Sequence, residues 1–308
     1  MRSVAAASCL AVLAFIALPA LGAARSAPID GCRPVVARHL PSDERSIEID
    51  TPDGVIRGTL AGPQGVAPRA LALLLHGYTG SRNEIPLASG EGMFAKTARA
   101  FATQGIATLR IDFIGSGLSD GDWAGTLFST QARDAVRAAR ALQAEHVDKN
   151  LALGVLGYSQ GGLIALRAAA AFDRIALWNP VIDPMATYSV IFGRDTILVA
   201  AQASAADETR FVIQETRLRP AFFAELIEAS PMDDAARTAA PVLVVTGRRD
   251  PLVAGGAALA ERMREKRKAE TVIFDVDAGH DLGAVHEPAL LDDVIACTAG
   301  FLLDSAAR

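Results

Sequence analysis

Short apolar runs alternate along the chain with longer stretches whose apolar residues recur at helical spacing. The apolar runs, which have the length of buried strands, occupy residues 70–75, 107–113, 151–156, 175–178, 241–246 and 271–276. The stretches with helical spacing cover about 92–104, 130–146, 160–171, 255–268 and 288–303. Strands that alternate with helices predict an α/β fold built on a mostly parallel, doubly wound sheet.

Two regions depart from this alternation. Residues 46–50 and 55–60 alternate apolar and polar positions around a Thr-Pro-Asp-Gly turn, which predicts an antiparallel hairpin at the start of the sheet. Residues 183–230 mix amphipathic and irregular polar stretches. Open α/β sheets bind ligands at the carboxyl ends of their strands, so we interpret 183–230 as a cap or lid inserted there. The α/β core would then comprise 45–182 and 231–305. A packing excursion without substrate contact is the alternative for the insertion.

The sequence GYSQG, residues 157–161, lies between a predicted strand and a predicted helix. In that context G-x-S-x-G is typical of a nucleophilic serine, here Ser159, on a sharp turn. Gly157 and Gly161 flank it because a Cβ would collide with the neighbouring strand or helix. The following helix directs N–H groups and the positive end of its dipole toward the site of a developing oxyanion. An ordinary serine in a glycine-rich turn is the alternative.

A nucleophilic serine requires a base, and the base requires an acid that fixes its tautomer. When the G-x-S-x-G serine comes first, the acid follows it and the histidine comes last. His280 follows the last predicted strand and is the expected base. Asp250 follows the strand 241–246 and is the expected acid, unless it merely caps its turn. The alternative acids are Asp183, Asp275 and Asp277.

An oxyanion hole needs two N–H donors, one from the residue after the nucleophile and one from the loop after the third strand. These donors would be the backbone N–H groups of Gln160 and Tyr78. His76 and Gly77 precede Tyr78 in the same turn. Because His76 lies upstream of the serine, we interpret it as a residue that shapes this loop and not as the catalytic base.

The glycine-rich loop 112–121 (DFIGSGLSDG) lacks the features of a phosphate-binding loop. It has neither the Lys-Ser/Thr pair of a P-loop nor the G-x-G-x-x-G spacing. We expect it to line the acyl side of the pocket. The three cysteines and five histidines show no zinc-ligand spacing, so neither a metal nor an organic cofactor is expected.

Residues 1–24 have the features of a signal peptide. Arg2 supplies the positive start, residues 4–21 are almost continuously apolar, and small residues follow. We expect cleavage and export to a periplasm or the outside; a retained membrane anchor is the alternative. Cys32 and Cys297 would then stand near opposite ends of the mature chain, where a disulfide is expected, with two separate buried thiols as the alternative.

Composition changes this picture little. With 308 residues, 51% of them apolar and 21% charged, the chain has the character of a globular enzyme. The net charge of −5 and the absence of a long basic run argue against a nucleic-acid or anionic-membrane partner. We interpret the basic stretch 262–268 as a solvated helix face. A small-molecule substrate is the expected partner, and the sequence does not determine the oligomeric state.

The blocks HGYTGS, DFIGSGLSDG, GYSQGG, GRRDPLV and AGHDL follow one another in the order and spacing of the α/β-hydrolase fold. Over about residues 45–305 the chain resembles the α/β-hydrolase superfamily. Its first three blocks resemble the bacterial cinnamoyl/feruloyl esterases and their serine-aminopeptidase-like relatives, which are mostly intracellular. The resemblance implies a triad of Ser159, Asp250 and His280, with Tyr78 and Gln160 as oxyanion donors.

The resemblance therefore implies an exported serine hydrolase that cleaves a carboxylic ester through an acyl-enzyme. Its substrates would be esters with aromatic or short acyl groups. The same triad would also serve an aminopeptidase-like peptidase, a thioesterase, a lipase-like enzyme, or an acyltransferase with an alcohol in place of water. A non-catalytic binding module on the same scaffold would require a broken triad.

Overall fold

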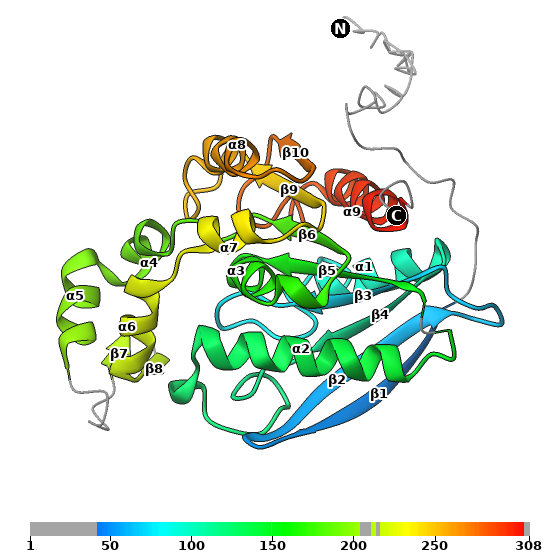
Figure 1. The fold of residues 1–308 in the computed structure, drawn as a ribbon, viewed down its shortest axis with the longest axis horizontal. Coiled ribbons are helices and arrows are strands. Elements are labelled where there is room, and N and C mark those ends of the chain that lie inside the picture. Colours follow the sequence, from blue (N-terminus) through cyan, green and yellow to red (C-terminus); the bar gives the residue numbers. More distant parts are fainter. Residues whose placement is uncertain (1–41, 149, 204–210, 214–215, 305–308) are drawn as a thin grey trace, which may run out of the picture.

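A mostly parallel sheet forms the centre of the molecule (Figure 1). The computed structural model describes residues 42–148, 150–203, 211–213 and 216–304, and within them one sheet has eight strands in the order β1-β2-β4-β3-β5-β6-β9-β10. These strands are β1 (Ser42–Thr51), β2 (Gly54–Pro63), β3 (Ala70–Leu75), β4 (Ile106–Ile111), β5 (Ala152–Tyr158), β6 (Arg174–Trp178), β9 (Val242–Gly247) and β10 (Thr271–Val276). The strands from β4 to β10 in this order pair in parallel, whereas β2 is antiparallel to β1 and β4.

The central strands are buried on both faces. In β3, Leu71 and Leu73 belong to one hydrophobic cluster, and Ala72 and Leu74 belong to another. Successive side chains of a strand point to opposite faces, so a continuously apolar strand requires helices on both sides. Full burial of one such leucine contributes roughly 1.5–3 kcal/mol.

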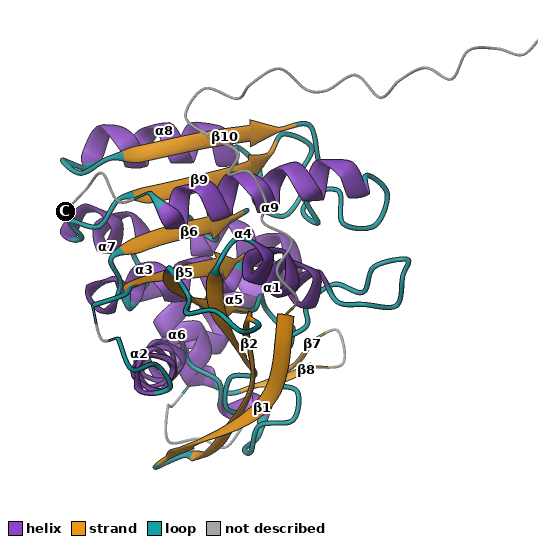
Figure 2. Cartoon of the chain, turned by 90° about the vertical axis from the view of Figure 1, so that its right-hand side faces the viewer, coloured by secondary structure: helices purple, strands orange, loops and turns teal. Residues whose placement is uncertain are grey.

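Helices supply this cover, as Figure 2 shows. The first cluster includes α2 (Phe128–Ala144), α3 (Gln160–Arg167) and α8 (Gly256–Lys266), and the second includes α1 (Met93–Thr103) and α9 (Pro288–Leu303). The predicted α/β fold with a doubly wound, mostly parallel sheet is confirmed.

Two boundaries around the predicted nucleophile differ from expectation. β5 extends through Gly157 and Tyr158, which pair with Leu177 and Trp178 of β6. The sequence suggested a turn there because glycine is rare inside strands. The helix after Ser159 ends at Arg167, and a short 3-10 turn, η2 (Ala169–Ala171), follows it.

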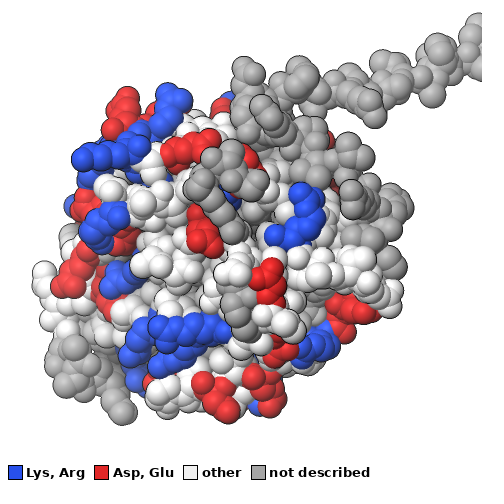
Figure 3. All heavy atoms as spheres, turned by 45° about the vertical axis from the view of Figure 1, so that its right-hand side comes forward, with Lys and Arg blue, Asp and Glu red and all other residues white. Residues whose placement is uncertain are grey.

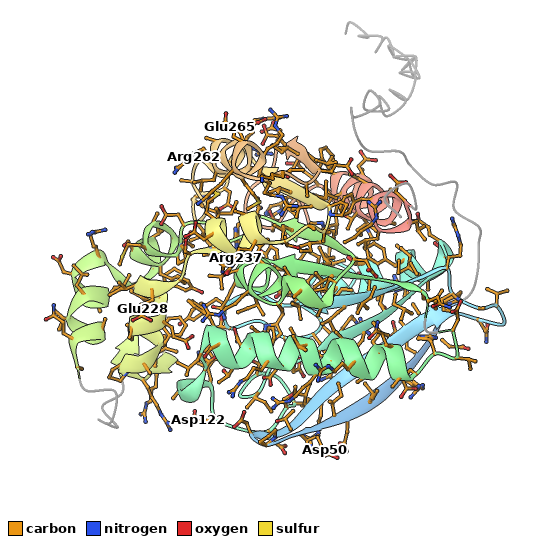
Figure 4. The ribbon with its side chains drawn as sticks, viewed as in Figure 1. Asp50, Asp122, Glu228, Arg237, Arg262 and Glu265 are labelled. Carbon is orange, nitrogen blue, oxygen red and sulfur yellow. The ribbon has the colours of Figure 1, made fainter. Side chains whose placement is uncertain are left out.

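The predicted hairpin is present at the edge of the sheet. Thr51 pairs with Gly54 across the turn and donates its hydroxyl to the Gly54 carbonyl. Asp50 lies at this tip, at the bottom of Figure 4. The Asp120 carboxylate accepts hydrogen bonds from the Val55 N–H and the Arg57 guanidinium, at 3.0 and 2.6 Å. The loop 112–121 is thereby fastened to the hairpin.

The chain between β6 and β9 leaves the sheet and returns to it. It forms α4 (Pro184–Phe192), α5 (Arg194–Gln202), β7 (Phe211–Ile213), β8 (Thr216–Leu218), α6 (Pro220–Glu228) and α7 (Pro231–Arg237). All but α7 stand together at the left of Figure 1. Residues 183–230 lie in this connection between the neighbouring strands β6 and β9, and we call them the inserted segment. Glu228 and Arg237, labelled in Figure 4, mark the ends of α6 and α7.

Positive and negative side chains are interspersed on the face drawn in Figure 3. In the basic stretch 262–268, Arg262 and Glu265 project from the outer side of α8 (Figure 4). Arg267 does not fit the predicted solvated face, because it is 7% exposed. Its guanidinium donates to the carbonyls of Ala235 and Ala240, both at 2.6 Å, and so fastens α7 to the core.

The N-terminal predictions fall outside the described residues. The predicted signal peptide, residues 1–24, and Cys32 lie before the described residues, so the signal peptide, its cleavage and the disulfide stay predictions. Cys297 lies in α9 and is buried. Among the described residues, no helix combines the length and apolar character that crossing a membrane requires.

Candidate active site

Ser159 occupies the turn between β5 and α3 in a conformation that is rare for a residue with a side chain. Its φ is +52° and its ψ is −116°. Such positive φ values cost of order 1–3 kcal/mol and persist where the surroundings enforce them. Here the Ser159 N–H donates to the Trp178 carbonyl at 2.9 Å, and the Ser159 carbonyl accepts from the Val181 N–H at 3.0 Å. The end of the neighbouring strand therefore holds the turn.

The two flanking glycines are sterically required. A Cβ on Gly157 would lie 2.3 Å from the carbonyl oxygen of Gly161, and a Cβ on Gly161 would lie 2.1 Å from that of Leu75. Both distances are far inside van der Waals contact, and the obstacles are backbone atoms. Any larger residue would displace β5, α3 or β3 and move Ser159.

Ser159, His280 and Asp250 form one hydrogen-bonded row. His280 Nε2 lies 3.0 Å from Ser159 Oγ, and His280 Nδ1 lies 2.6 Å from Asp250 Oδ2. Because a carboxylate only accepts, Nδ1 donates to Asp250, and in the neutral imidazole Nε2 is then the acceptor for the serine hydroxyl. In such a row the imidazole can take the serine proton, and the carboxylate stabilises the resulting imidazolium.

The other aspartates considered as acids have different partners. The Asp183 carboxylate caps α4 by accepting from the Ala186 N–H. Asp275 pairs with Arg248, and Asp277 pairs with Arg249. Of these four candidate acids, only Asp250 is bonded to His280 in the described part of the chain.

The environment of Asp250 favours its ionised form. Burial opposes the charge, but the hydrogen bond and charge of His280 and the N–H groups of Val253 and Leu252 outweigh it and lower the pKa of Asp250. Asp250 Oδ1 accepts from Leu252 N–H at 2.8 Å and from Val253 N–H at 3.0 Å. Asp250 thus presents a fixed, charged acceptor to His280 at neutral pH.

Two residues outside the predicted set hold the backbone of His280. The Asn179 side chain donates to the carbonyls of Gly279 and His280, at 3.1 and 2.9 Å, and accepts from the Gly247 N–H at 2.7 Å. The Tyr158 hydroxyl donates to the same His280 carbonyl at 3.2 Å. Asn179 directly follows β6, and its position at the carboxyl end of a central strand was the available sequence signal for a functional role.

The turn after β3 lies beside Ser159. A Cβ on Gly77 would be 3.3 Å from the Cβ of Ser159, and Tyr78 lines the same cavity as Ser159. Gln160, the other predicted oxyanion donor, is the first residue of α3. Gln160 therefore directly follows Ser159, and Tyr78 lines the same cavity as the serine.

His76 is buried, and both of its ring nitrogens face backbone groups. Nδ1 donates to the Gly77 carbonyl at 2.9 Å, and Nε2 accepts from the Phe113 N–H at 3.2 Å. Burial lowers the pKa of His76 to about 4, so the ring is neutral near pH 7. This arrangement joins the loop after β3 to the loop after β4 and matches the structural role expected for His76.

Glu84 is a further site residue that the sequence did not reveal. Its Oε1 accepts a hydrogen bond from the Gly77 N–H, and its side chain lines the cavity. Burial raises the pKa of Glu84 to about 7, against the lowering effect of the Gly77 hydrogen bond. The carboxyl group therefore holds the Gly77–Tyr78 turn and adds a titratable group to the site.

A cavity of about 610 Å³ is lined by Ser159 and His280. This volume lies within the roughly 300–1,000 Å³ typical of small-molecule sites. One wall comes from α4 of the inserted segment, through Thr187, Tyr188, Val190 and Ile191. The other aromatic and aliphatic side chains that line the cavity are those of Tyr78, Ile85, Tyr158, Val181 and Leu252.

The expectation that the loop 112–121 lines the acyl side of the pocket was wrong. None of its residues lines this cavity. Instead, the buried Asp112 carboxylate accepts from the backbone N–H and the guanidinium of Arg82, and from the Leu118 N–H. Through these bonds to Arg82, the loop 112–121 supports the segment that follows Gly77.

The described residues offer no metal site of the usual kind. Among them, no group of three or more His, Cys, Asp or Glu side chains is placed to hold a metal ion.

Comparisons with known proteins agree with this architecture. Residues 67–206 match the family model described as serine aminopeptidase, S33. That range contains Ser159 but neither Asp250 nor His280. An uncharacterised 31.7 kDa protein of Escherichia coli is 29% identical over 117 residues, a stretch that spans 38% of this chain and 38% of that protein.

Solved structures are similar over most of the chain. Est1E from Butyrivibrio proteoclasticus with bound ferulic acid has a TM-score of 0.66 at 18% identity, covering 84% of this chain and all of that one. The Pyrococcus furiosus esterase Pf2001 has a TM-score of 0.60 at 20% identity, covering 84% and 90%. Brefeldin A esterase has a TM-score of 0.60 at 16% identity, covering 87% and 78%. The chain therefore has the α/β-hydrolase fold, and it resembles the serine-aminopeptidase-like branch, as the motifs predicted.

Proposed function

We propose that this protein is a serine hydrolase that cleaves carboxylic esters of small molecules through an acyl-enzyme. One observation carries the proposal: the unbroken row from Ser159 Oγ through His280 to Asp250, with distances of 3.0 and 2.6 Å. The row faces a cavity large enough for a small ester. Similarity in fold to several esterases supports the assignment.

In the acylation step, Ser159 Oγ attacks the ester carbonyl carbon while its proton passes to His280 Nε2. The imidazolium is stabilised by the ionised Asp250 across the 2.6 Å hydrogen bond. The carbonyl oxygen becomes an oxyanion, which the backbone N–H groups of Tyr78 and Gln160 would bind. Collapse breaks the bond to the alcohol oxygen, which leaves with the proton from His280.

In the deacylation step, water replaces the alcohol. His280 Nε2 takes a proton from the water, whose oxygen attacks the acyl carbon, and the same two N–H groups stabilise the second oxyanion. The bond to Ser159 Oγ breaks, and Oγ recovers its proton from His280. The products are a carboxylic acid, an alcohol and the unchanged enzyme.

The cavity favours aromatic or short acyl groups. The rings of Tyr78 and Tyr188 meet edge to face, 5.7 Å apart, and aliphatic side chains complete the lining. An aromatic ligand gains contact with such rings at little entropic cost. Ferulic acid, bound by the fold relative Est1E, is an acid of this chemical kind.

The first test compares the wild-type protein with its Ser159→Ala variant. Both would be assayed with p-nitrophenyl butyrate, methyl ferulate and an alanine anilide. We expect ester hydrolysis by the wild type and a loss of roughly 10⁴-fold or more in the variant. A variant as active as the wild type would refute the role of Ser159, and turnover of the anilide alone would identify a peptidase.

An aminopeptidase-like peptidase is the second candidate, and one observation favours it. Glu84 presents a carboxyl group to the cavity that contains Ser159. A carboxylate there would bind the ammonium group of a free amino terminus. Hydrolysis of the alanine anilide that is lost in Glu84→Gln, while ester hydrolysis persists, would support this candidate.

A thioesterase or an acyltransferase would use the same row of residues. An acyltransferase would transfer the acyl group from Ser159 to an acceptor alcohol. Added glycerol or methanol would then divert product from the free acid to a new ester, whereas a hydrolase would continue to release mainly acid. A coenzyme A thioester assayed beside its p-nitrophenyl counterpart would distinguish the thioesterase.

We further propose that residues 1–24 direct export to the periplasm or the medium and are then removed. Arg2 and the apolar run 4–21 support this. A mature amino terminus near residue 25, found in the periplasmic fraction or the medium, is the expected result. Full-length protein retained in the membrane would favour the anchor instead.

A disulfide between Cys32 and Cys297 belongs to the same proposal, because exported chains mature in oxidising compartments. Intact-mass analysis without reductant should find the mature chain about two hydrogens lighter than its reduced form. Alkylation of two free thiols in the unreduced protein would refute the bridge.

A further inference from the structure

A buried row of polar side chains joins the inserted segment to the turn that carries Ser159. The Tyr188 hydroxyl, on α4, donates to Oε1 of Gln160 at the start of α3. Gln160 Nε2 donates to Gln131 Oε1 on α2 at 2.7 Å, and Gln131 Nε2 donates to Thr126 Oγ1 at 3.0 Å. Each residue of the row belongs to a different part of the fold.

All three hydrogen bonds of this row are donated in the same direction, from Tyr188 toward Thr126, and water has little access to them. Tyr188, Gln160 and Gln131 are each 1% exposed. Both glutamine amides accept through oxygen and donate through nitrogen. Each hydrogen bond therefore satisfies polar groups whose burial would otherwise cost free energy. Burial and the neighbouring Tyr78 raise the pKa of Tyr188 well above its ordinary value, so its hydroxyl remains a donor at neutral pH.

Gln160 is the link that bears on chemistry. Its side chain is held between Tyr188 and Gln131, and its backbone N–H is one of the two donors assigned to the oxyanion. Such donors act when they lie about 2.7–3.1 Å from the developing charge, and a displacement of about 1 Å can cost on the order of 10²-fold in rate. Anchoring the side chain limits the movement of this N–H.

We propose that Tyr188 is a positioning residue that fixes the oxyanion donor Gln160. The rate of turnover would therefore depend on how the inserted segment packs against the start of α3. The inference rests on the proposed serine-hydrolase function. It gives Tyr188 two separate tasks, because its ring lines the cavity and its hydroxyl holds Gln160.

Tyr188→Phe separates these two tasks. The ring contacts with Phe192 and Tyr78, at 5.7 Å each, would remain, while the hydrogen bond to Gln160 is lost. If the hydroxyl positions the oxyanion donor, every substrate loses rate by a similar factor. If Tyr188 only packs, effects appear in KM and in acyl preference.

The experiment uses the full chain and two readouts. The first is the rate of Ser159 inactivation by a small alkyl fluorophosphonate, whose phosphoryl oxygen occupies the oxyanion site. The second is kcat and KM for p-nitrophenyl acetate and butyrate. We expect Tyr188→Phe to lower the inactivation rate and both kcat values by about 10-fold, with KM little changed.

Gln131→Leu tests the same row from its other side, and it carries the test alone if Tyr188→Phe does not fold. It should lower the same rates in the same direction, and the double variant should lose less than the product of the two single losses. Val199→Ala is the matched control, because Val199 lies on the inserted segment at an exposed position outside the cavity lining and leaves Tyr188 and its hydroxyl undisturbed. It should leave kcat on the acetate unchanged.

Two results would contradict the inference in different ways. Wild-type inactivation rate and kcat in Tyr188→Phe, or in Gln131→Leu where that variant carries the test, would overturn the positioning role and leave the hydrolase function intact. A wild-type protein that the fluorophosphonate does not label at Ser159 would refute the hydrolase function, and the inference with it.

Discussion

The two sides of the cavity are held by different kinds of interaction. On the core side, backbone groups hold the row of Ser159, His280 and Asp250. The Ser159 N–H is bonded to the end of β6, and the Asp250 carboxylate accepts hydrogen bonds from two backbone N–H groups. On the side of the inserted segment, aromatic rings dominate: Tyr188 stacks on Phe192 at 5.7 Å and meets Phe222 edge to face at 5.6 Å.

This difference suggests that the core side governs the rate of the reaction and the inserted segment governs the choice of substrate. Backbone hydrogen bonds are directional and hold catalytic atoms within the narrow range that proton transfer requires. Ring contacts tolerate rearrangement, so residues can change there without unfolding the sheet. We therefore expect core-side substitutions to change kcat strongly, and substitutions of the cavity-lining apolar side chains of the inserted segment to change mainly which ester is preferred. The Tyr188 hydroxyl is the exception on that side, because it is bonded to Gln160 of the core.

The largest expected effect is that of Asp250→Asn. An amide in this position keeps the shape but favours the wrong tautomer of His280, which lowers kcat by about 10⁴-fold in comparable triads. Steady-state kinetics on p-nitrophenyl butyrate measures the loss. Asp277→Asn is the matched control, since Asp277 pairs with Arg249 at the surface, and it should retain activity. The reverse result would make Asp277 the acid.

The second largest decrease in kcat is expected from substitutions that disturb the loop carrying His280. Asn179→Asp keeps the acceptor for Gly247 but replaces the donor that faces the Gly279 and His280 carbonyls. Repulsion between these oxygens should move His280 and lower kcat by about 10- to 100-fold. Tyr158→Phe removes one 3.2 Å hydrogen bond to the same carbonyl and should cost less. Equal, small losses in both variants would show that the loop does not need these donors.

Glu84→Gln should change how stability depends on pH. The pKa of Glu84 is about 7 in the folded protein, against an ordinary value of 4.5. Between these values the folded state keeps a proton that the unfolded chain has released, so the stabilisation is present below 4.5 and is lost as pH rises through 7.

The change amounts to no more than about 3 kcal/mol between about pH 4.5 and pH 8. Urea unfolding across that range measures it, and the loss with rising pH should be smaller in Glu84→Gln by that amount. Identical pH dependence in the two proteins would mean that Glu84 titrates normally.

The smallest effect is expected in the inserted segment. Ile191→Ala enlarges the wall that α4 contributes to the cavity and should shift the butyrate-to-acetate preference by about 10-fold or less. Val199→Ala, at an exposed position of α5 outside the cavity lining, is the control and should keep the wild-type ratio. A loss of kcat on all esters without a change in preference would contradict the division between the two sides.

The sequence predicted the strands of the core and the row of three residues because these depend on local order. A buried parallel strand must be apolar throughout, and each residue of the row follows such a strand at its carboxyl end. The errors concern contacts between distant elements. The loop 112–121 faces the hairpin through Asp120, and Arg267 is buried because carbonyls of Ala235 and Ala240 accept its guanidinium.

What the sequence determined by itself is the order of strands and helices and the chemical types at their ends, because periodicity and glycine geometry act over a few residues. Only the tertiary structure decided which groups share the cavity. Glu84 and Tyr188 line it beside Ser159, and Asn179 holds the backbone of His280, although the three come from separate parts of the chain. They come together because β3, β5 and β6 are neighbours in the sheet and α4 forms one wall of the cavity. Such proximity is a property of packing, which no local pattern encodes.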